Sequence, residues 1–282
     1  MTDKRLIVSS IQDEASQNIL SKLLESDWNE CDRWNENPIY ERGDDLIVTI
    51  DERHIYFDDI DRKIERYLGV EVDEVVYISK HSSEAGVDSL TVHPIGNYGE
   101  AKYGGKEGKL VPASPHSMTH ALHILREKAE MEGIKNEYKI SFEATHHGPF
   151  LETPTYYIEI GSDLDSWKDE SAGKVIADTV LEVKDRSKTD EPVVICIGGG
   201  HYTPRFTDLA KSRRVALGHI VPGWGMRYLN KKSFSEAVEK TPEVDYIYFD
   251  RSSTSGKERE KVRSWTDKHC LEIIRSSDLE KR

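Results

Sequence analysis

Residues 141–161 read SFEATHHGPFLETPTYYIEIG. Two short apolar runs, each typical of a β-strand, flank a turn that contains adjacent histidines followed by glycine and proline. His146 and His147 lie at the end of the first run, and Glu159 lies inside the second. Because side chains at the ends of strands can converge on one cleft, this stretch predicts both a sheet and a functional site at its edge.

Similar apolar runs recur along the whole chain and alternate with segments of helical period. The predicted strands are 6–8, 46–50, 75–78, 90–92, 138–142, 156–160, 193–197, 215–221 and 246–249. The predicted helices are 12–25, 60–68, 115–132, 164–183, 233–239 and 256–269. This alternation favours the α/β class, with a mixed, largely parallel sheet flanked by helices. We expect a single α/β domain over residues 1–282, with irregular surface insertions near 28–45 and 96–114.

The composition restricts the partners and the cellular location. With 39 Lys and Arg against 52 Asp and Glu, the formal net charge is -13, so a polyanion must meet a local basic patch. The cysteines Cys31, Cys196 and Cys270 are odd in number and widely spaced, which argues against a disulfide framework and indicates a reducing, cytoplasmic location. No run approaches the roughly 20 apolar residues of a membrane span, so no membrane partner is expected. The oligomeric state stays open, with a monomer favoured.

Six of the 11 histidines lie beside Gly, Pro or Ser at the ends of probable strands, namely His81, His93, His146, His147, His201 and His219. His146 and His147 would point to opposite faces of a regular strand, so both reach one site only if the backbone turns there. Glu143 would share a face with His147 and could orient it. For His219, which lies in an apolar stretch, a structural histidine in the core is the competing interpretation.

Glu159 lies on one face of a strand whose other face is apolar. A buried carboxylate needs a cation, a metal or several hydrogen-bond donors. A salt bridge to Lys or Arg is the simpler account, and a metal ligand or a base that activates water is the functional one. The number of imidazoles nearby favours function. Residues 198–200 are three glycines directly after a predicted strand, so their amides could stabilise an oxyanion, although a tight turn is the simpler explanation.

Five blocks, taken in chain order, resemble the archaeal- and plant-type D-aminoacyl-tRNA deacylases. They are Lys80-His81-Ser82-Ser83, Thr91-Val92-His93-Pro94-Ile95-Gly96-Asn97, Glu143-Ala144-Thr145-His146-His147-Gly148-Pro149, Tyr157-Ile158-Glu159-Ile160-Gly161-Ser162 and Gly199-Gly200-His201-Tyr202-Thr203-Pro204. The resemblance covers nearly the whole chain. It implies a zinc-dependent hydrolase that removes D-amino acids such as D-tyrosine from tRNA, with a fold similar to phosphorylase and peptidyl-tRNA hydrolase folds.

The resemblance also implies roles for individual residues. Zinc, as one or two ions, would activate water to cleave the aminoacyl ester. The expected metal ligands are His93, His146, His201 and Glu159. The expected catalytic groups are His81, His147, Glu159 and the amides of Gly199 and Gly200. From the basic and polar residues of the chain, we also expect Lys80, Asn97, Lys102, Lys106 and Arg205 to contact the substrate and the acceptor end of the tRNA, although a solvated loop is the commoner explanation for the lysines of 96–114. Which residue acts as the general base stays open.

Two other functions remain open. A zinc peptidase or amidase that acts on small D-amino acid derivatives would use the same histidines and glutamates without RNA. A non-catalytic RNA-binding module would have purely structural histidines, and the net charge disfavours it.

Overall fold

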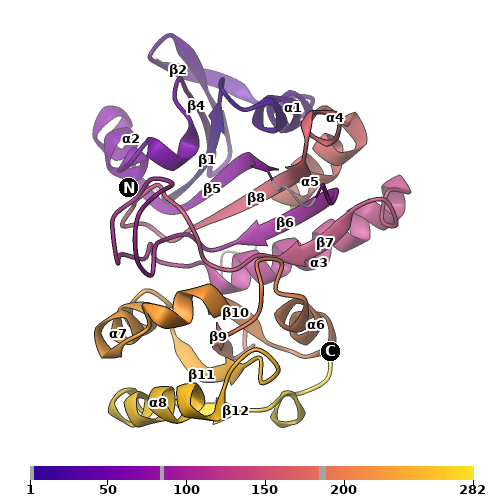
Figure 1. The fold of residues 1–282 in the computed structure, drawn as a ribbon. Helices are drawn as coiled ribbons and strands as arrows, with labels where there is room; N and C mark the ends of the chain where they lie inside the picture. The colour runs from indigo at the N-terminus through magenta and orange to yellow at the C-terminus, as the bar shows by residue number, and fades with distance from the viewer. Residues whose placement is uncertain (1–2, 83–85, 184–188) are drawn as a thin grey trace.

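A computed structural model describes residues 3–82, 86–183 and 189–282, which form two sheets with helices around them (Figure 1). Within these ranges the larger sheet has eight strands in the order β2-β3-β4-β1-β5-β8-β6-β7. Their bounds are β1 Asp3–Ser10, β2 Asn29–Trp34, β3 Asn37–Arg42, β4 Asp45–Ile50, β5 Glu71–Ser82, β6 Ser89–His93, β7 Lys139–Phe142 and β8 Thr155–Ser162. The smaller sheet, in the order β10-β9-β11-β12, contains β9 Val193–Ile197, β10 Ala216–Val221, β11 Val244–Phe249 and β12 Glu272–Ile274. Most neighbouring strands run parallel, so the predicted α/β class is confirmed.

Helices cover both faces of the larger sheet, and α7 Lys231–Glu239 and α8 Gly256–Thr266 pack against the smaller one. The other bounds are α1 Glu14–Leu23, α2 Ile60–Leu68, α3 Pro115–Glu132, α4 Leu164–Trp167, α5 Glu170–Glu182 and α6 Pro204–Ser212. Successive side chains of a strand point to opposite faces, so Ile7 of β1 packs in the core with α1 and α5, whereas Leu6 and Val8 pack with α2. No helix in the described ranges has the length and apolar character that a membrane crossing requires.

α3 lies between the two sheets (Figure 1). Met118 and Leu122 of this helix belong to the same buried cluster as Val92 of β6 and Leu217 of β10. Because one hydrophobic core passes through both sheets, we propose that the chain forms a single domain.

The helix predictions succeed where one period runs without interruption. α2 and α3 have the predicted bounds, 60–68 and 115–132. The predicted helix 164–183 is wrong as one element, because Asp169 accepts a hydrogen bond from the Ser171 amide and begins a new helix, α5. Ser83, which belongs to the first block of the resemblance, lies outside the described residues.

The predicted irregular insertion near 28–45 is also wrong. Most of this stretch is a hairpin of β2 and β3, which extends the larger sheet beyond β4. Its turn residues Asn35 and Glu36 have φ of 47° and 68°, the left-handed conformation of a tight hairpin turn. Most side chains of this exposed edge are polar. The stretch therefore lacks the alternation of apolar and polar residues from which a strand is predicted.

The stretch 96–114 forms no helix or strand element, as predicted, but it is only partly a surface loop. Tyr98, Leu110 and Val111 are buried, and the loop passes close to the turn that follows the adjacent histidines. A Cβ on Gly148 would lie 2.2 Å from the Gly105 amide nitrogen, so the two segments meet backbone to backbone. The loop therefore helps to form the wall of the site.

Candidate metal centre

The site forms where strand ends of the larger sheet meet the smaller sheet. Glu159 of β8 is the register partner of Ser79 in β5 and Thr91 in β6, which places His81 and His93 on the neighbouring strands close to it. The segment after β7 carries Glu143 and crosses to the smaller sheet. Its Ala144 amide donates to the carbonyl of His201, 2.9 Å away, and the Thr145 amide donates to that of Ile220, 3.0 Å away. Strand ends of the larger sheet, the segment after β7 and the His201 loop of the smaller sheet are thus brought together.

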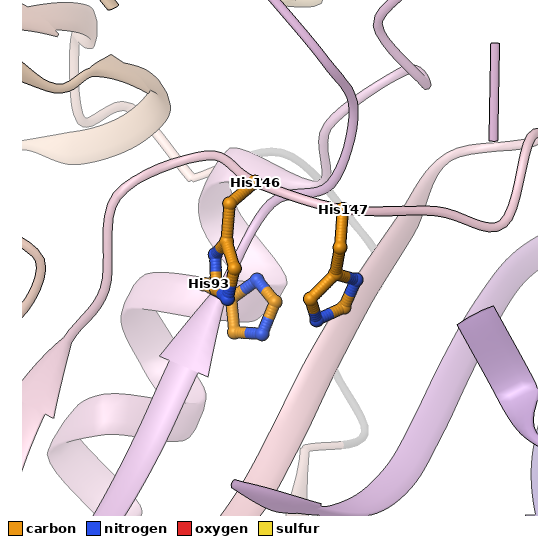
Figure 2. Close-up of side chains that lie close together, drawn as sticks. All are labelled: His93, His146 and His147. Carbon is orange, nitrogen blue, oxygen red and sulfur yellow. The ribbon is translucent and has the colours of Figure 1, made fainter. Parts of the chain in front are cut away.

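His146 and His147 reach the same site, and the predicted turn of the backbone is confirmed. His147 has φ of 46°, a left-handed conformation that breaks the strand alternation. Figure 2 shows both side chains extending from one loop toward His93, which comes from the end of β6. The ring centroid of His146 lies 4.3 Å from that of His93 and 4.3 Å from that of His147.

The hydrogen bonds of these three imidazoles leave the same nitrogen free in each ring. Nδ1 lies near a backbone carbonyl in every case: Pro94 for His93 (3.1 Å), Ala144 for His146 (2.8 Å) and Gly148 for His147 (2.6 Å). A carbonyl only accepts, so Nδ1 carries the proton and the Nε2 lone pair is available. Metal-binding histidines are held in this way, with one nitrogen donating to a backbone carbonyl and the other facing the ion.

Two carboxylates lie buried among the histidines. Glu143 is 0% exposed and Glu159 is 2% exposed. His93 Nε2 lies 3.3 Å from Glu159 Oε2, and His201 Nε2 lies 2.9 Å from Glu143 Oε2. His81 Nδ1 lies between them, 3.4 Å from Glu143 Oε1 and 3.6 Å from Glu159 Oε2. Glu143 therefore faces His201 and His81, with His146 Nε2 also 3.7 Å from its Oε2, and the expectation that it orients His147 is wrong.

Several buried atoms of this cluster lack a hydrogen bond within the part of the chain that the structure describes. They are both carboxylate oxygens of Glu143, Oε2 of Glu159 and Nε2 of His93. The short separations above thus lack hydrogen-bond geometry, and burying such atoms without partners is costly. Atoms with available lone pairs that converge on one point fit a cation, and imidazole with carboxylate suits zinc.

Three groups of donor atoms have the spacing of a metal site, with all ligand atoms within 4.8 Å of one another. They are His93 with His146 and His147, His81 with Glu143 and His201, and His93 with Glu143 and Glu159. The first two groups share no residue, so the cluster has donors for two ions. The predicted ligands His93, His146, His201 and Glu159 are divided among these groups and do not form one set. The predicted catalytic histidines His81 and His147 instead lie among the potential ligands.

The charge around each imidazole differs strongly. Burial disfavours protonation of His81, but the nearby negative charges of Glu159 and Glu143 outweigh it and raise the pKa of His81 to about 9. Burial and the neighbouring His93 lower the pKa of His147 to about 4. Burial raises the pKa of Glu159, yet His81 and His93 outweigh this and hold it below its usual value. The carboxylates are therefore ionised, and His147 is neutral, as a metal ligand must be. His81 is protonated at neutral pH, so it would lose this proton on binding an ion.

Two cavities open on the cluster. The larger, about 770 Å³, is lined by Gln12, Asp13, Arg53, His54, Ile55, Ser79, Lys80, His81, Ser82, Tyr103, His146, His147, Glu159, His201 and Tyr202. The smaller, about 350 Å³, has walls from the loop 96–103 and from the segment 222–228 that follows β10. Trp224 of the second segment has no local pattern that would have predicted it, because the residue reaches the site only through the packing of the two sheets.

Four of the residues predicted to contact RNA are divided among three cavities. Lys80 lines the larger cavity, where its Nζ lies 2.5 Å from Glu14 Oε2. Lys102 lies on the smaller cavity, and Lys106 lies over the Phe150 ring. Asn97 lines the smaller cavity, but its amide donates to the Gly104 carbonyl and holds the loop together. Arg205 lines a separate cavity with Arg251 and Arg275.

The expected oxyanion-stabilising role of Gly199 is contradicted by the hydrogen bonds of its loop. The Gly199 amide donates to Ser253 Oγ, 2.6 Å away, and the Gly198 amide donates to the Val221 carbonyl, 2.8 Å away. An amide that already has a partner cannot also stabilise an oxyanion without breaking that bond. Neither Gly199 nor Gly200 lines either cavity described above. The glycines form the turn that carries His201, which is the simpler of the two interpretations.

His219 is a structural histidine, as the competing interpretation held. It is fully buried, its Nε2 donates to the Val111 carbonyl (3.0 Å), and its Nδ1 accepts from Thr145 Oγ1 (3.1 Å). Burial, reinforced by the charge of Lys240, lowers its pKa to about 4. The neutral form is therefore the one that the folded protein accommodates.

Acid is expected to destabilise the fold through His219. Its folded pKa lies below the unfolded value of about 6.5, so the unfolded state binds more protons as the pH falls from about 6.5 to 4, and stability is lost in that range. Between pH 7 and pH 5 this group alone should cost about 2 kcal/mol of unfolding free energy. Urea unfolding of the wild type and of His219→Gln at both pH values measures the difference. The variant should lose less stability than the wild type, and His269→Gln should match the wild type; equal losses in all three would contradict the assignment.

Comparison with known proteins identifies the family of this chain. The family model described as D-aminoacyl-tRNA deacylase matches residues 68–274. The D-aminoacyl-tRNA deacylase of Thermococcus onnurineus is 39% identical over 276 residues, 96% of this chain and 99% of that protein. The D-aminoacyl-tRNA deacylase of Pyrococcus horikoshii is 36% identical over 280 residues, again 96% of this chain and 99% of that protein. The crystal structure of AF0625, described as a conserved protein of unknown function, matches with a TM-score of 0.91 and 32% identity over 99% of this chain and 98% of that one. The chain therefore belongs to the D-aminoacyl-tRNA deacylase family.

Proposed function

We propose that this protein hydrolyses the ester bond of D-aminoacyl-tRNA, such as D-Tyr-tRNA, and releases the free D-amino acid and tRNA. Membership of the family and the names of the relatives support this proposal. The observation that carries it is the cluster of the buried His93, the half-buried His146 and His147 and two buried glutamates at the junction of two cavities. The tRNA acceptor end is the partner that follows, in a cytoplasmic and monomeric protein. The three free cysteines suit a reducing compartment.

Zinc is the cofactor that we propose for the cluster. His93, His146 and His147 would hold one ion through Nε2, and His81, Glu143 and His201 are the donors for a second. When bound, zinc would lower the pKa of a coordinated water to about 7 and polarise a carbonyl, which suits ester hydrolysis near neutral pH.

Glu159 is the residue that we assign as general base. It lies between the two disjoint donor groups, with its Oε2 buried and without a hydrogen bond among the described residues. In this role Oε2 accepts a proton from the water that attacks the ester carbonyl. The Tyr202 hydroxyl lies 3.2 Å from His81 Nε2, and this contact holds that imidazole in place at the edge of the larger cavity.

The direct test compares D-Tyr-tRNA with L-Tyr-tRNA, each before and after chelation and after zinc is restored. We expect hydrolysis of the D-ester alone, its loss on chelation and its recovery with zinc. A free D-tyrosine ester serves as the third substrate. Equal activity on the free ester and on the tRNA ester would favour a peptidase or amidase that does not use RNA. No hydrolysis of any of the three with metal present would contradict the proposal.

A further inference from the structure

The two cavities share one boundary. Tyr103, His146, His147 and His201 line both of them, so a bond placed at these histidines has room for one part of the substrate on each side. An aminoacyl-tRNA has two unlike parts, an amino acid and a terminal nucleoside, joined by the ester. The chemistry of the two walls then decides which part lies where.

The walls of the smaller cavity are aromatic. Trp224, Tyr98, Tyr228 and Pro222 line it, and Trp224 is 45% exposed although it is a large apolar side chain. The Trp224 ring stacks on His201, with centroids 6.1 Å apart and planes at 29°. An exposed aromatic face beside the reacting centre suits a flat base, because every nucleobase has a π-face that stacks on such a ring.

The position of Trp224 is fixed by the fold. It belongs to the short 3-10 helix Gly223–Arg227, whose first amide donates to the Gly199 carbonyl, 2.8 Å away. The loop from the larger sheet closes on the other side, where a Cβ on Gly99 would lie 2.7 Å from the Tyr228 ring. A rigid stacking surface needs this support, since an ordered ring loses little freedom when a ligand binds.

Positive charge also lines the smaller cavity. Arg227 and Lys102 line the smaller cavity, and its one carboxylate, Glu100, is paired with Lys102 at 3.1 Å. In the described part of the chain Arg227 has no acidic partner; its guanidinium lies over the Tyr228 ring. The larger cavity contains the carboxylates of Asp13 and Glu159, which suit an ammonium group, together with Arg53 and with Lys80, which is paired with Glu14. Cations at an open aromatic cavity favour a nucleotide and its phosphates.

We propose that the smaller cavity binds the 3′-terminal nucleoside of the tRNA, with its base stacked on Trp224 and the adjoining phosphate at Arg227, and that the larger cavity holds the D-aminoacyl group. This assignment rests on the proposed function. It places the ester at the shared histidines. The exposed mouth of the smaller cavity then lets the polynucleotide leave toward solvent.

The test separates the two parts of the substrate. Trp224→Ala should raise KM for D-Tyr-tRNA by about 10- to 100-fold, the loss expected for one stacked base, while kcat/KM for D-tyrosine methyl ester stays within about twofold. Trp224→Phe, which retains an aromatic face, should lie close to the wild type. Tyr67→Ala is the matched control, because Tyr67 is 49% exposed but lies on α2 and lines neither cavity.

A binding assay makes the result independent of catalysis. The trinucleotide CCA, which carries no amino acid, is titrated calorimetrically into the zinc-loaded wild type, Trp224→Ala and Tyr67→Ala. We expect the affinity for CCA to fall about 10-fold or more in Trp224→Ala alone.

No binding of CCA to the wild type, or equal binding to all three proteins, would overturn the assignment, even if the deacylase activity is present. If the deacylase activity is absent but CCA binding depends on Trp224, the proposed function fails while the nucleotide site stands. If Trp224→Ala lowers kcat/KM equally for the tRNA ester and for the methyl ester, the amino acid and not the base contacts Trp224. That result would also overturn the assignment of the smaller cavity to the nucleoside.

Discussion

His93→Ala is expected to lose the zinc ion that we propose for His93, His146 and His147 and to lower kcat for D-Tyr-tRNA by about 10³-fold. His93 is fully buried, and its Nε2 belongs to two of the three donor groups, one with His146 and His147 and one with the two glutamates. Its removal deprives both groups of a ligand, and a metal supplies several kcal/mol of transition-state stabilisation, which corresponds to a loss of this size. Zinc content after dialysis and single-turnover hydrolysis are the two measurements.

The matched control for this substitution is His120→Ala. His120 lies on α3, is exposed, and takes no part in the three donor groups. It should retain both the zinc content and the rate of the wild type. If His93→Ala binds as much zinc as this control and hydrolyses the D-ester as fast, the metal centre that we propose is wrong.

Glutamine at position 159 is expected to lower kcat by about 10³-fold while KM changes little. The amide has the shape of the carboxylate but cannot accept the proton of the attacking water, and general bases contribute about 10²- to 10⁴-fold. Because the six donors of the two disjoint groups remain, zinc content should be unchanged. The measurements are the hydrolysis rate of Glu159→Gln at saturating D-Tyr-tRNA and its zinc content.

The control for Glu159→Gln is Glu152→Gln, a neighbour in the same segment whose carboxylate is exposed and pairs with Arg62. This variant should keep the wild-type rate. Loss of zinc along with activity in Glu159→Gln would move Glu159 from general base to metal ligand. An unchanged rate would remove it from the mechanism altogether.

Much of the fold follows from local pattern. α2 and α3 have the predicted bounds because an uninterrupted helical period is a property of a few adjacent turns. The hairpin β2–β3 lacks such a pattern, since an exposed edge strand buries too few side chains to alternate. It forms because β4 offers unpaired backbone groups to β3, which is a contact of the tertiary structure.

The site likewise has features that follow from local sequence and features that depend on tertiary contacts. The sequence by itself determined the chemistry: imidazoles at strand ends, a carboxylate on a buried strand and a turn that brings two adjacent histidines to one place. Only the tertiary structure decided the partners. Glu143 faces His201 because two sheets meet there, and the Gly199 amide is taken by Ser253, 54 positions away. Donor type is a property of each side chain, whereas a ligand set depends on distances between segments that are joined only by packing.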